Sequence, residues 1–219
     1  PLRFKGTSVT NWTLLRSNTR LFCDTDKNLA VREARSRINR FQLPSGLILD
    51  DRGVRSFQYH CFSMAMVAEI FDQTYDEYFL TSFMKGVGFI RNFILSNGET
   101  LYIGRGQNQS FGYGVLIYIL ALAYRYSKDN TILGDIEKVY NFLIQFQRDD
   151  GSFPLVMNTT ERGIPQEVSV SDPNYPGWYP YNNYFDYLPF MGYFITKAVI
   201  VLKELDTSIV THQVSRDYK

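Results

Sequence analysis

Apolar residues recur at helical spacing in three separate parts of the chain. In residues 27–41, Val31, Ala34, Ile38 and Phe41 follow one another at intervals of three or four, and arginines occupy much of the opposite face. Residues 79–93 and 132–146 repeat this pattern. The spacing predicts three amphipathic helices, each with one face exposed to solvent.

Runs of a different kind lie between these helices. Residues 61–71, 115–124 and 188–202 are apolar on nearly every side of a helical projection. A helix that is apolar all round must be surrounded by other elements, whereas an amphipathic helix lies at the edge. The alternation therefore predicts an inner layer of helices wrapped by an outer layer.

The chain also repeats internally. A shift of 54 positions places SFQY (56–59) on SFGY (110–113), and a shift of 53 places Asn97-Gly98 on Asp150-Gly151. With a first pair near residues 9–23 and 27–41 and a fourth inner helix beginning near Tyr184, the pattern predicts about three and a half helical hairpins. We expect an all-α fold with one domain over residues 1–205 and a polar tail over 206–219.

The connections between the expected helices differ in length. Inner-to-outer turns are short, whereas the outer-to-inner loops cover residues 42–55, 97–109 and 149–183. In antiparallel hairpins the long loops all fall on one face, together with the N-termini of every inner helix. Helix N-termini offer free backbone N–H groups and partial positive charge, so this face is the expected site for an anionic ligand.

Composition excludes several classes of function. The chain has 219 residues, 45% of them hydrophobic and 21% charged, with a net charge of +1, so nothing global favours nucleic acid or an anionic membrane. No apolar stretch is long enough to span a bilayer, and no signal peptide opens this sequence. Metal, nucleotide and flavin motifs are absent, so we predict no cofactor.

The segment GRGQNQSFGYG (104–114) enters the apolar run at 115–124 and opens onto the expected functional face. Arg105 is a fixed cation, and Gln107 and Gln109 are neutral hydrogen-bond donors and acceptors. Tyr113 is expected at the mouth of the face, as the repeat counterpart of Tyr59. The alternative is a capped turn whose amides satisfy carbonyls of the loop itself.

Three motifs give the chain a family resemblance. NWTLLR (11–16), DDRGVRSFQYH (50–60) and GRGQNQSFGYG (104–114) resemble, in order and spacing, segments of the (α/α)-toroid domains of heparinase II/III-type and related uronate polysaccharide lyases. The similarity covers about residues 8–125 and is greatest to an uncharacterised bacterial toroid family. It implies an (α/α) toroid or partial toroid that acts on acidic glycans.

The resemblance also implies roles for individual residues. In these lyases an Asn on one inner helix neutralises the uronate carboxylate, and a Tyr on the next inner helix acts as acid and base. The matching positions here are Asn11 and Tyr59. Many family members carry His directly after that Asn, where this chain has Trp12, which is expected to fill the core or to stack on a sugar. His60 is then the nearest histidine that could act as the base.

The chemistry needs few groups. Elimination removes the C5 proton of a uronate, which is weakly acidic until its carboxylate is neutralised, a task that suits Asn11, Gln58 and Arg105. Tyr59 would take that proton and protonate the leaving oxygen. Structural alternatives stay open: Tyr59 seals a helix end by hydrogen bonding, and Asn11 is an N-cap.

The long third loop supplies further candidates. Residues 172–187 alternate aromatics with turn formers and amides, and Trp178 and Tyr184 are expected to form a sugar-binding platform. Asp186, with Asp51 and Asp150, offers carboxylates for a competing hydrolytic scheme, which needs two such groups facing one another across a sugar. The alternative is a proline-rich loop that packs upon its own aromatic residues.

We therefore expect a lyase that acts on a uronic-acid-containing glycan. A toroid glycoside hydrolase resembling glucuronidases is the second hypothesis, and a non-catalytic glycan-binding or scaffold module is the third. Three and a half hairpins are few for a closed ring, so a further domain or a homo-oligomer is expected to complete it. The resemblance implies a bacterial cytoplasmic or periplasmic protein.

Overall fold

The computed structural model describes residues 9–100, 108–157 and 184–205, with the side chains of the last range given from Tyr187 onward. These residues form seven helices and only isolated β-bridges, so the predicted all-α fold is confirmed. The helices are α1 (Thr10–Phe22), α2 (Lys27–Phe41), α3 (Phe57–Thr74), α4 (Glu77–Arg91), α5 (Ser110–Ser127), α6 (Thr131–Ile144) and α7 (Tyr184–Glu204).

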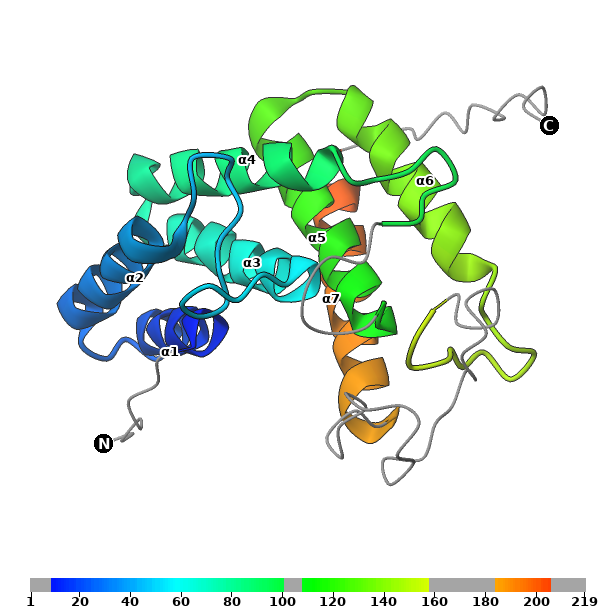
Figure 1. Ribbon diagram of the computed structural model, residues 1–219, viewed down its shortest axis with the longest axis horizontal. Helices are drawn as coiled ribbons and strands as arrows, with labels where there is room; N and C mark the ends of the chain where they lie inside the picture. Colours follow the sequence, from blue (N-terminus) through cyan, green and yellow to red (C-terminus); the bar gives the residue numbers. More distant parts are fainter. Residues whose placement is uncertain (1–8, 101–107, 158–183, 206–219) are drawn as a thin grey trace.

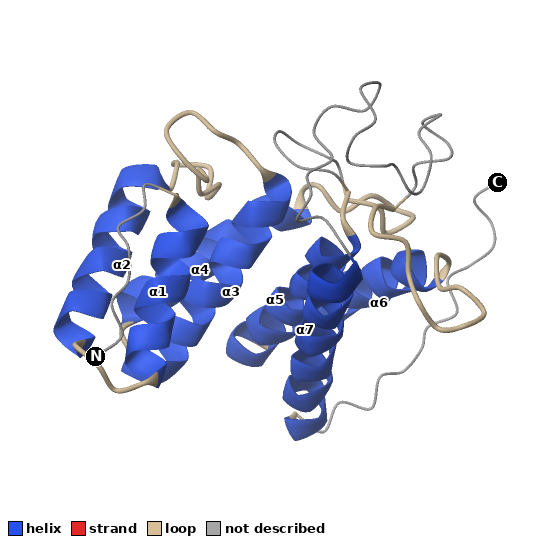
Figure 2. Ribbon diagram, turned by 90° about the horizontal axis from the view of Figure 1, so that it is seen from below, coloured by secondary structure: helices blue, strands red, loops and turns tan. Residues whose placement is uncertain are grey.

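The helices form two layers, as the apolar pattern predicts. α1, α3, α5 and α7 pack side by side as the inner layer, and α2, α4 and α6 each pack on the inner helix that precedes them (Figure 1). Within α3 and α5 most residues are buried, 12 of 18 and 13 of 18, whereas the outer helices bury one face each. The described parts of the loops that lead from outer to inner helices lie at the end of the molecule where α3 and α5 begin (Figure 2), which we call the loop end.

The hairpins repeat in detail. Leu43, Leu95 and Arg148 each accept a backbone hydrogen bond from a glycine three residues later, and each of these glycines has a positive φ: Gly46, Gly98 and Gly151. Gly46 and Gly98 lie so close to the next outer helix that an added Cβ would meet the carbonyl oxygen of Lys85 or Lys138. The turns at Gly46 and Gly98 therefore dock their hairpins onto the following ones.

The true register of the repeat is 53 residues at the inner helices. α3 and α5 have the same length of 18 residues, and their C-caps, Tyr75 and Lys128, both adopt the left-handed conformation. This register pairs Tyr113 with His60, not with Tyr59 as the SFQY and SFGY motifs suggest. The motif alignment is wrong by one residue because a short stretch of similar letters outweighs the spacing of the turns.

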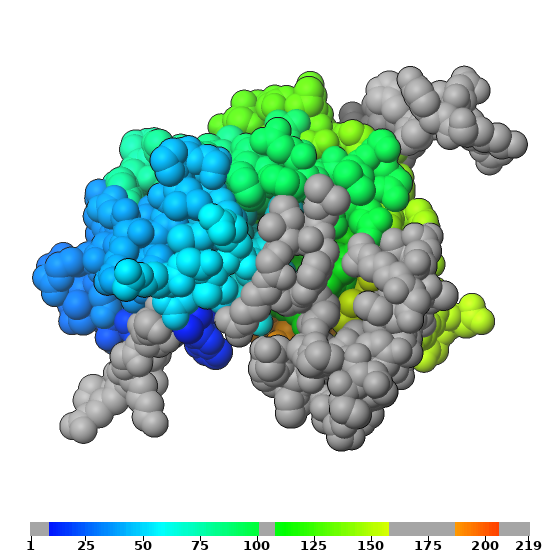
Figure 3. Space-filling model, viewed as in Figure 1, coloured from blue at the N-terminus to red at the C-terminus, as the bar shows by residue number. Residues whose placement is uncertain are grey.

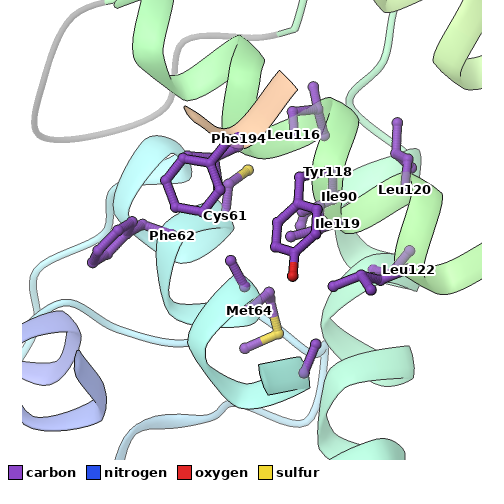
Figure 4. Close-up of a cluster of buried hydrophobic side chains, with 14 of the residues drawn as sticks. Cys61, Phe62, Met64, Ile90, Leu116, Tyr118, Ile119, Leu120, Leu122 and Phe194 are labelled. Carbon is purple, nitrogen blue, oxygen red and sulfur yellow. The ribbon is translucent and has the colours of Figure 1, made fainter. Parts of the chain in front are cut away.

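The core is continuous across the hairpins. Phe62, Tyr118 and Phe194 come from three inner helices and pack together in the interface that Figure 4 shows, with ring centroids 6.2 Å apart for Phe62 and Phe194 and 5.6 Å for Tyr118 and Phe194. Gly114 lets α5 approach the backbone of α7 at Met191. In the space-filling view the hairpins coloured blue to cyan meet the green ones along their upper edge (Figure 3).

A polar cluster joins all four inner helices on one wall. The carboxylate of Glu69 on α3 accepts hydrogen bonds from Asn18 of α1 and from Tyr118 of α5, and it forms an ion pair with Lys197 of α7. The side chains of Glu69 and Lys197 are only 15% and 29% exposed. We call this group the Glu69 cluster. Because it draws one side chain from every inner helix, it fixes their relative positions.

Candidate active site

The N-terminal ends of the inner helices carry most of the residues that the sequence singled out. α3 begins after Ser56, whose hydroxyl accepts the backbone N–H of Tyr59 at 3.3 Å and caps the helix. Gln58 and Tyr59 therefore occupy its first turn, at the loop end. Tyr59 is half-buried and packs against the core cluster.

The structure brings Gln58 and Gln109 into direct contact. The amide Nε2 of Gln58 donates a hydrogen bond to Oε1 of Gln109, which directly precedes α5. Both side chains are buried, with 7% and 6% of their surface exposed. The Oε1 atom of Gln58 is buried and has no hydrogen-bond partner in the described part of the chain. A buried carbonyl oxygen without a donor costs about 1–3 kcal/mol, so this atom is suited to accept a hydrogen bond from a ligand.

The entrance to α5 is held in place by the loop after α6. Ser110 donates its backbone N–H to Leu155 at 2.9 Å, and Met157 donates to the carbonyl of Asn108 at 2.7 Å. The Asn108 side chain donates to Glu99 at 3.5 Å, so this amide serves the loop itself, as the capped-turn alternative anticipates. Gln109 reaches across to α3, where its side chain accepts a hydrogen bond from Gln58.

Asn11 lies in the first turn of α1 at the loop end and is 5% exposed. It is not the N-cap, because Val9 holds that position and no side chain caps the helix. The neighbouring Thr10 donates its backbone N–H to the carbonyl of Asp50 at 2.7 Å, which joins α1 to the loop before α3. Trp12 is 61% exposed, so the expectation that it fills the core is wrong.

His60 occupies the core and not the surface of the site. Its ring is fully buried, its Nδ1 accepts the backbone N–H of Ile48 at 3.1 Å, and its Nε2 donates to the carbonyl of Gly86 at 3.2 Å. Burial lowers the pKa of His60 to about 4, which keeps the ring neutral. With both nitrogens engaged and no exposed surface, His60 is not placed to take a proton from a substrate.

Tyr113 is likewise buried, with 2% of its surface exposed. Its hydroxyl accepts the backbone N–H of Thr100 at 3.5 Å, and its ring lies 5.3 Å from that of Phe142. Burial raises the pKa of Tyr113 to about 12. His60 and Tyr113 thus play the same part in successive repeats, because each receives a backbone N–H from the preceding loop. The exposed mouth position expected for Tyr113 is not observed.

Several of the expected site residues are only partly described or not described. Arg105, Gln107 and Trp178 lie outside the described residues, and the side chains of Tyr184 and Asp186 are not described although α7 begins at Tyr184. Asp150 belongs to a surface turn, where its Oδ1 accepts the backbone N–H of Ser152 at 2.9 Å and lowers the pKa of its carboxyl. Asp51 accepts the backbone N–H of Arg52 at 2.7 Å.

Sequence reasoning missed Asp50. Its side chain is 2% exposed, and its backbone bridges the start of α1 and the loop before α3. Carboxylates are seldom buried without a purpose, so Asp50 is the carboxylate of greatest functional interest in the described part of the chain. Asp50 is the first residue of the motif DDRGVRSFQYH, in which only the second residue, Asp51, was considered as a candidate.

Four inner helices have their N-termini at one end, and α1, α3 and α5 are each covered by the outer helix that follows; this arrangement decides the architecture. The fold is that of an (α/α) toroid. A polysaccharide lyase matches 93% of this chain with a TM-score of 0.63 and 15% identity, and a glycosyl hydrolase of family 88 from Bacteroides vulgatus matches 87% with a TM-score of 0.62 and 15% identity. No protein-family model and no curated protein matches the sequence.

The toroid of this chain is partial. The chain spans 63% of the length of the lyase and 61% of that of the hydrolase. At 15% identity the likeness establishes the architecture alone. Among the described residues, no group of three or more potential metal ligands comes together. In the same part of the chain, no helix has the length and apolarity that crossing a membrane requires.

Proposed function

We propose that the chain is an enzyme that acts on uronic-acid-containing poly- or oligosaccharide, and that it is a lyase working by β-elimination. The observation that carries this proposal is the buried pair Gln58 and Gln109 beside Tyr59, at the loop ends of neighbouring inner helices. The fold it shares with a polysaccharide lyase supports the assignment. The chain forms a single domain over residues 1–205 in this proposal.

In this mechanism two amides bind the substrate carboxylate, and Tyr59 acts first as the base and then as the acid. Nδ2 of Asn11 and the second N–H of Gln58 Nε2 donate hydrogen bonds to the uronate carboxylate and make the C5 proton more acidic. The phenolate of Tyr59 takes this proton, the C4–O bond breaks, and a C4–C5 double bond forms. Tyr59 then returns the proton to the leaving oxygen. The proposed set excludes His60 and Tyr113 because both are buried with their polar atoms engaged.

A saturated product would indicate the second candidate, a toroid glycoside hydrolase. The buried carboxylate of Asp50 and the fold shared with a family 88 hydrolase favour this alternative. Most glycosidases use a pair of carboxylates, one as the acid and the other as the base or nucleophile. The two candidates therefore differ in the residue whose loss abolishes turnover, Tyr59 for the lyase and Asp50 for the hydrolase.

The test is a panel of uronic-acid polysaccharides followed by ultraviolet absorbance, since the conjugated double bond of an elimination product absorbs there. We expect absorbance to rise with the wild-type protein and the rate to fall at least about 100-fold in Tyr59→Phe, the range of general acid–base catalysis. Tyr140→Phe, on the exposed part of α6, is the matched control and keeps the wild-type rate.

Two results would contradict the lyase assignment. Release of saturated sugar that Asp50→Asn abolishes and Tyr59→Phe spares would establish the hydrolase instead. Binding of a glycan without turnover of any member of the panel would favour a non-catalytic module.

A further inference from the structure

An aromatic cluster lies directly beside the candidate site and has no role in the proposed chemistry. Phe62 of α3, Phe111 of α5 and Phe190 of α7 belong to the first two turns of three inner helices. The ring centroid of Phe190 lies 6.0 Å from that of Phe62 and 6.3 Å from that of Phe111. These three rings, which we call the aromatic floor, come from the same helix ends as Gln58, Tyr59 and Gln109.

One ring of the floor is open to solvent. Phe62 and Phe111 are 9% and 4% exposed, but Phe190 is 44% exposed although it contacts both of them. Its contact with Phe62 places Phe190 on the flank of α7 that faces α3, the same flank from which Lys197 reaches Glu69. At about 100° per residue, Val199 lies on the opposite side of α7 from Phe190.

A polar acceptor borders this floor. The side chain of Gln58 crosses the helix interface at Gly112, where its Cγ lies 3.3 Å from the position that a Cβ would take. Gly112 follows Phe111 directly in the chain, so Gln58 packs on the same turn of α5 that carries one ring of the floor. The buried Oε1 of Gln58 has no hydrogen-bond partner among the described residues.

These features suit a sugar ring. A pyranose presents C–H groups on one face, which pack on an aromatic ring, and hydroxyl groups around its edge, which donate to oxygen acceptors. We propose that Phe190, supported by Phe62 and Phe111, is a stacking subsite for a pyranose ring of the glycan, and that Gln58 Oε1 accepts a hydrogen bond from one of its hydroxyls. This rests on the proposed function only in taking the ligand to be a glycan, and it requires no elimination.

Calorimetric titration with uronic-acid oligosaccharides and with neutral oligosaccharides of equal length tests the subsite. The titrations use Tyr59→Phe as the background, so that the ligand is not consumed. We expect Phe190→Leu, which keeps apolar volume but removes the ring, to weaken binding at least about tenfold. Phe190→Trp, which keeps an aromatic face, retains binding. Val199→Ala, also on α7 and 43% exposed, is the matched control and leaves the affinity unchanged.

Unchanged affinity in Phe190→Leu, equal weakening by the Val199 control, or a failure of every oligosaccharide to bind would overturn the subsite. The result is separable from that for the lyase. Binding that depends on Phe190 without any rise in absorbance removes the lyase and keeps the subsite. A rise in absorbance with the same KM in Phe190→Leu removes the subsite and keeps the lyase.

Discussion

At the scale of single residues, burial separates side chains that a motif places next to one another. Tyr59 and His60 are neighbours in the chain, yet Tyr59 is half-buried at the loop end whereas His60 is completely enclosed. Residues adjacent on a helix point about 100° apart, so sequence could show that one of them faces inward, but not which. The structure shows that His60 is the residue that faces inward, because its ring hydrogen-bonds to the backbone of Ile48 and Gly86.

The enclosure of His60 predicts how stability depends on pH. Its pKa is lowered to about 4 in the folded protein, from an ordinary value near 6.5, so protons bind the unfolded chain more readily. The stabilisation is complete above about pH 6.5 and is lost as the pH falls towards about 4. Between about pH 7 and pH 5 we expect the free energy of unfolding to fall by roughly 2 kcal/mol more in wild type than in His60→Gln.

Urea denaturation at a series of pH values measures this difference. Parallel pH dependences for the wild type and His60→Gln would show that His60 is accessible to protons in the folded state. A protonated, accessible ring would restore it as a candidate catalytic base.

At the scale of elements, the sequence predicted the helices well because their apolar spacing extends over several turns. It did not predict the register of the repeat, because the similarity of SFQY and SFGY is local. Register is fixed by the turns at Leu43, Leu95 and Arg148, whose glycines all have positive φ. The glycines of the first two turns, Gly46 and Gly98, also pack closely on the next hairpin. These contacts join residues that are far apart in the chain, so they are visible only in the structure.

The turns predict a contrast between two glycines. Gly98→Ala introduces a Cβ at a φ of 87° and against the carbonyl of Lys138, so we expect a loss of at least about 2 kcal/mol of stability. Gly88→Ala, on α4 where an added Cβ meets nothing within 4 Å, is the control, and we expect a gain of up to about 1 kcal/mol from helix propensity. Thermal denaturation of both variants measures the contrast. Equal shifts of the two melting temperatures would mean that the turn does not dock the hairpins.

At the scale of the whole molecule, the resemblance and the layering predicted the toroid, and the comparisons confirm that fold. The Glu69 cluster was not predicted, since Glu69 and Lys197 lie 128 residues apart, Asn18 and Lys197 lie farther apart still, and no motif joins them. Tyr193, Val199 and Ile200 are exposed on α7. That a further domain or another copy of the chain completes the ring stays a prediction.

The Glu69 cluster predicts coupling between all four inner helices. Glu69→Ala removes an acceptor shared by Asn18, Tyr118 and Lys197 and leaves a partly buried cation unpaired, so we expect a loss of about 2–4 kcal/mol in the free energy of unfolding. Glu77→Ala, at an exposed position of α4, changes it by about 0.5 kcal/mol or less. Chemical denaturation compares the two. Equal effects would show that the cluster contributes no more than a surface charge.

The central claim is that the loop end, between the first turns of α1, α3 and α5, holds the uronate. The most direct measurement is a crystal structure of Tyr59→Phe soaked with a uronic-acid oligosaccharide that the wild-type protein cleaves. The account predicts a sugar carboxylate within hydrogen-bond distance of Gln58 or Asn11 and C5 next to the ring of residue 59. A sugar bound at the opposite end of the inner helices, or one whose carboxylate contacts neither amide, would contradict it.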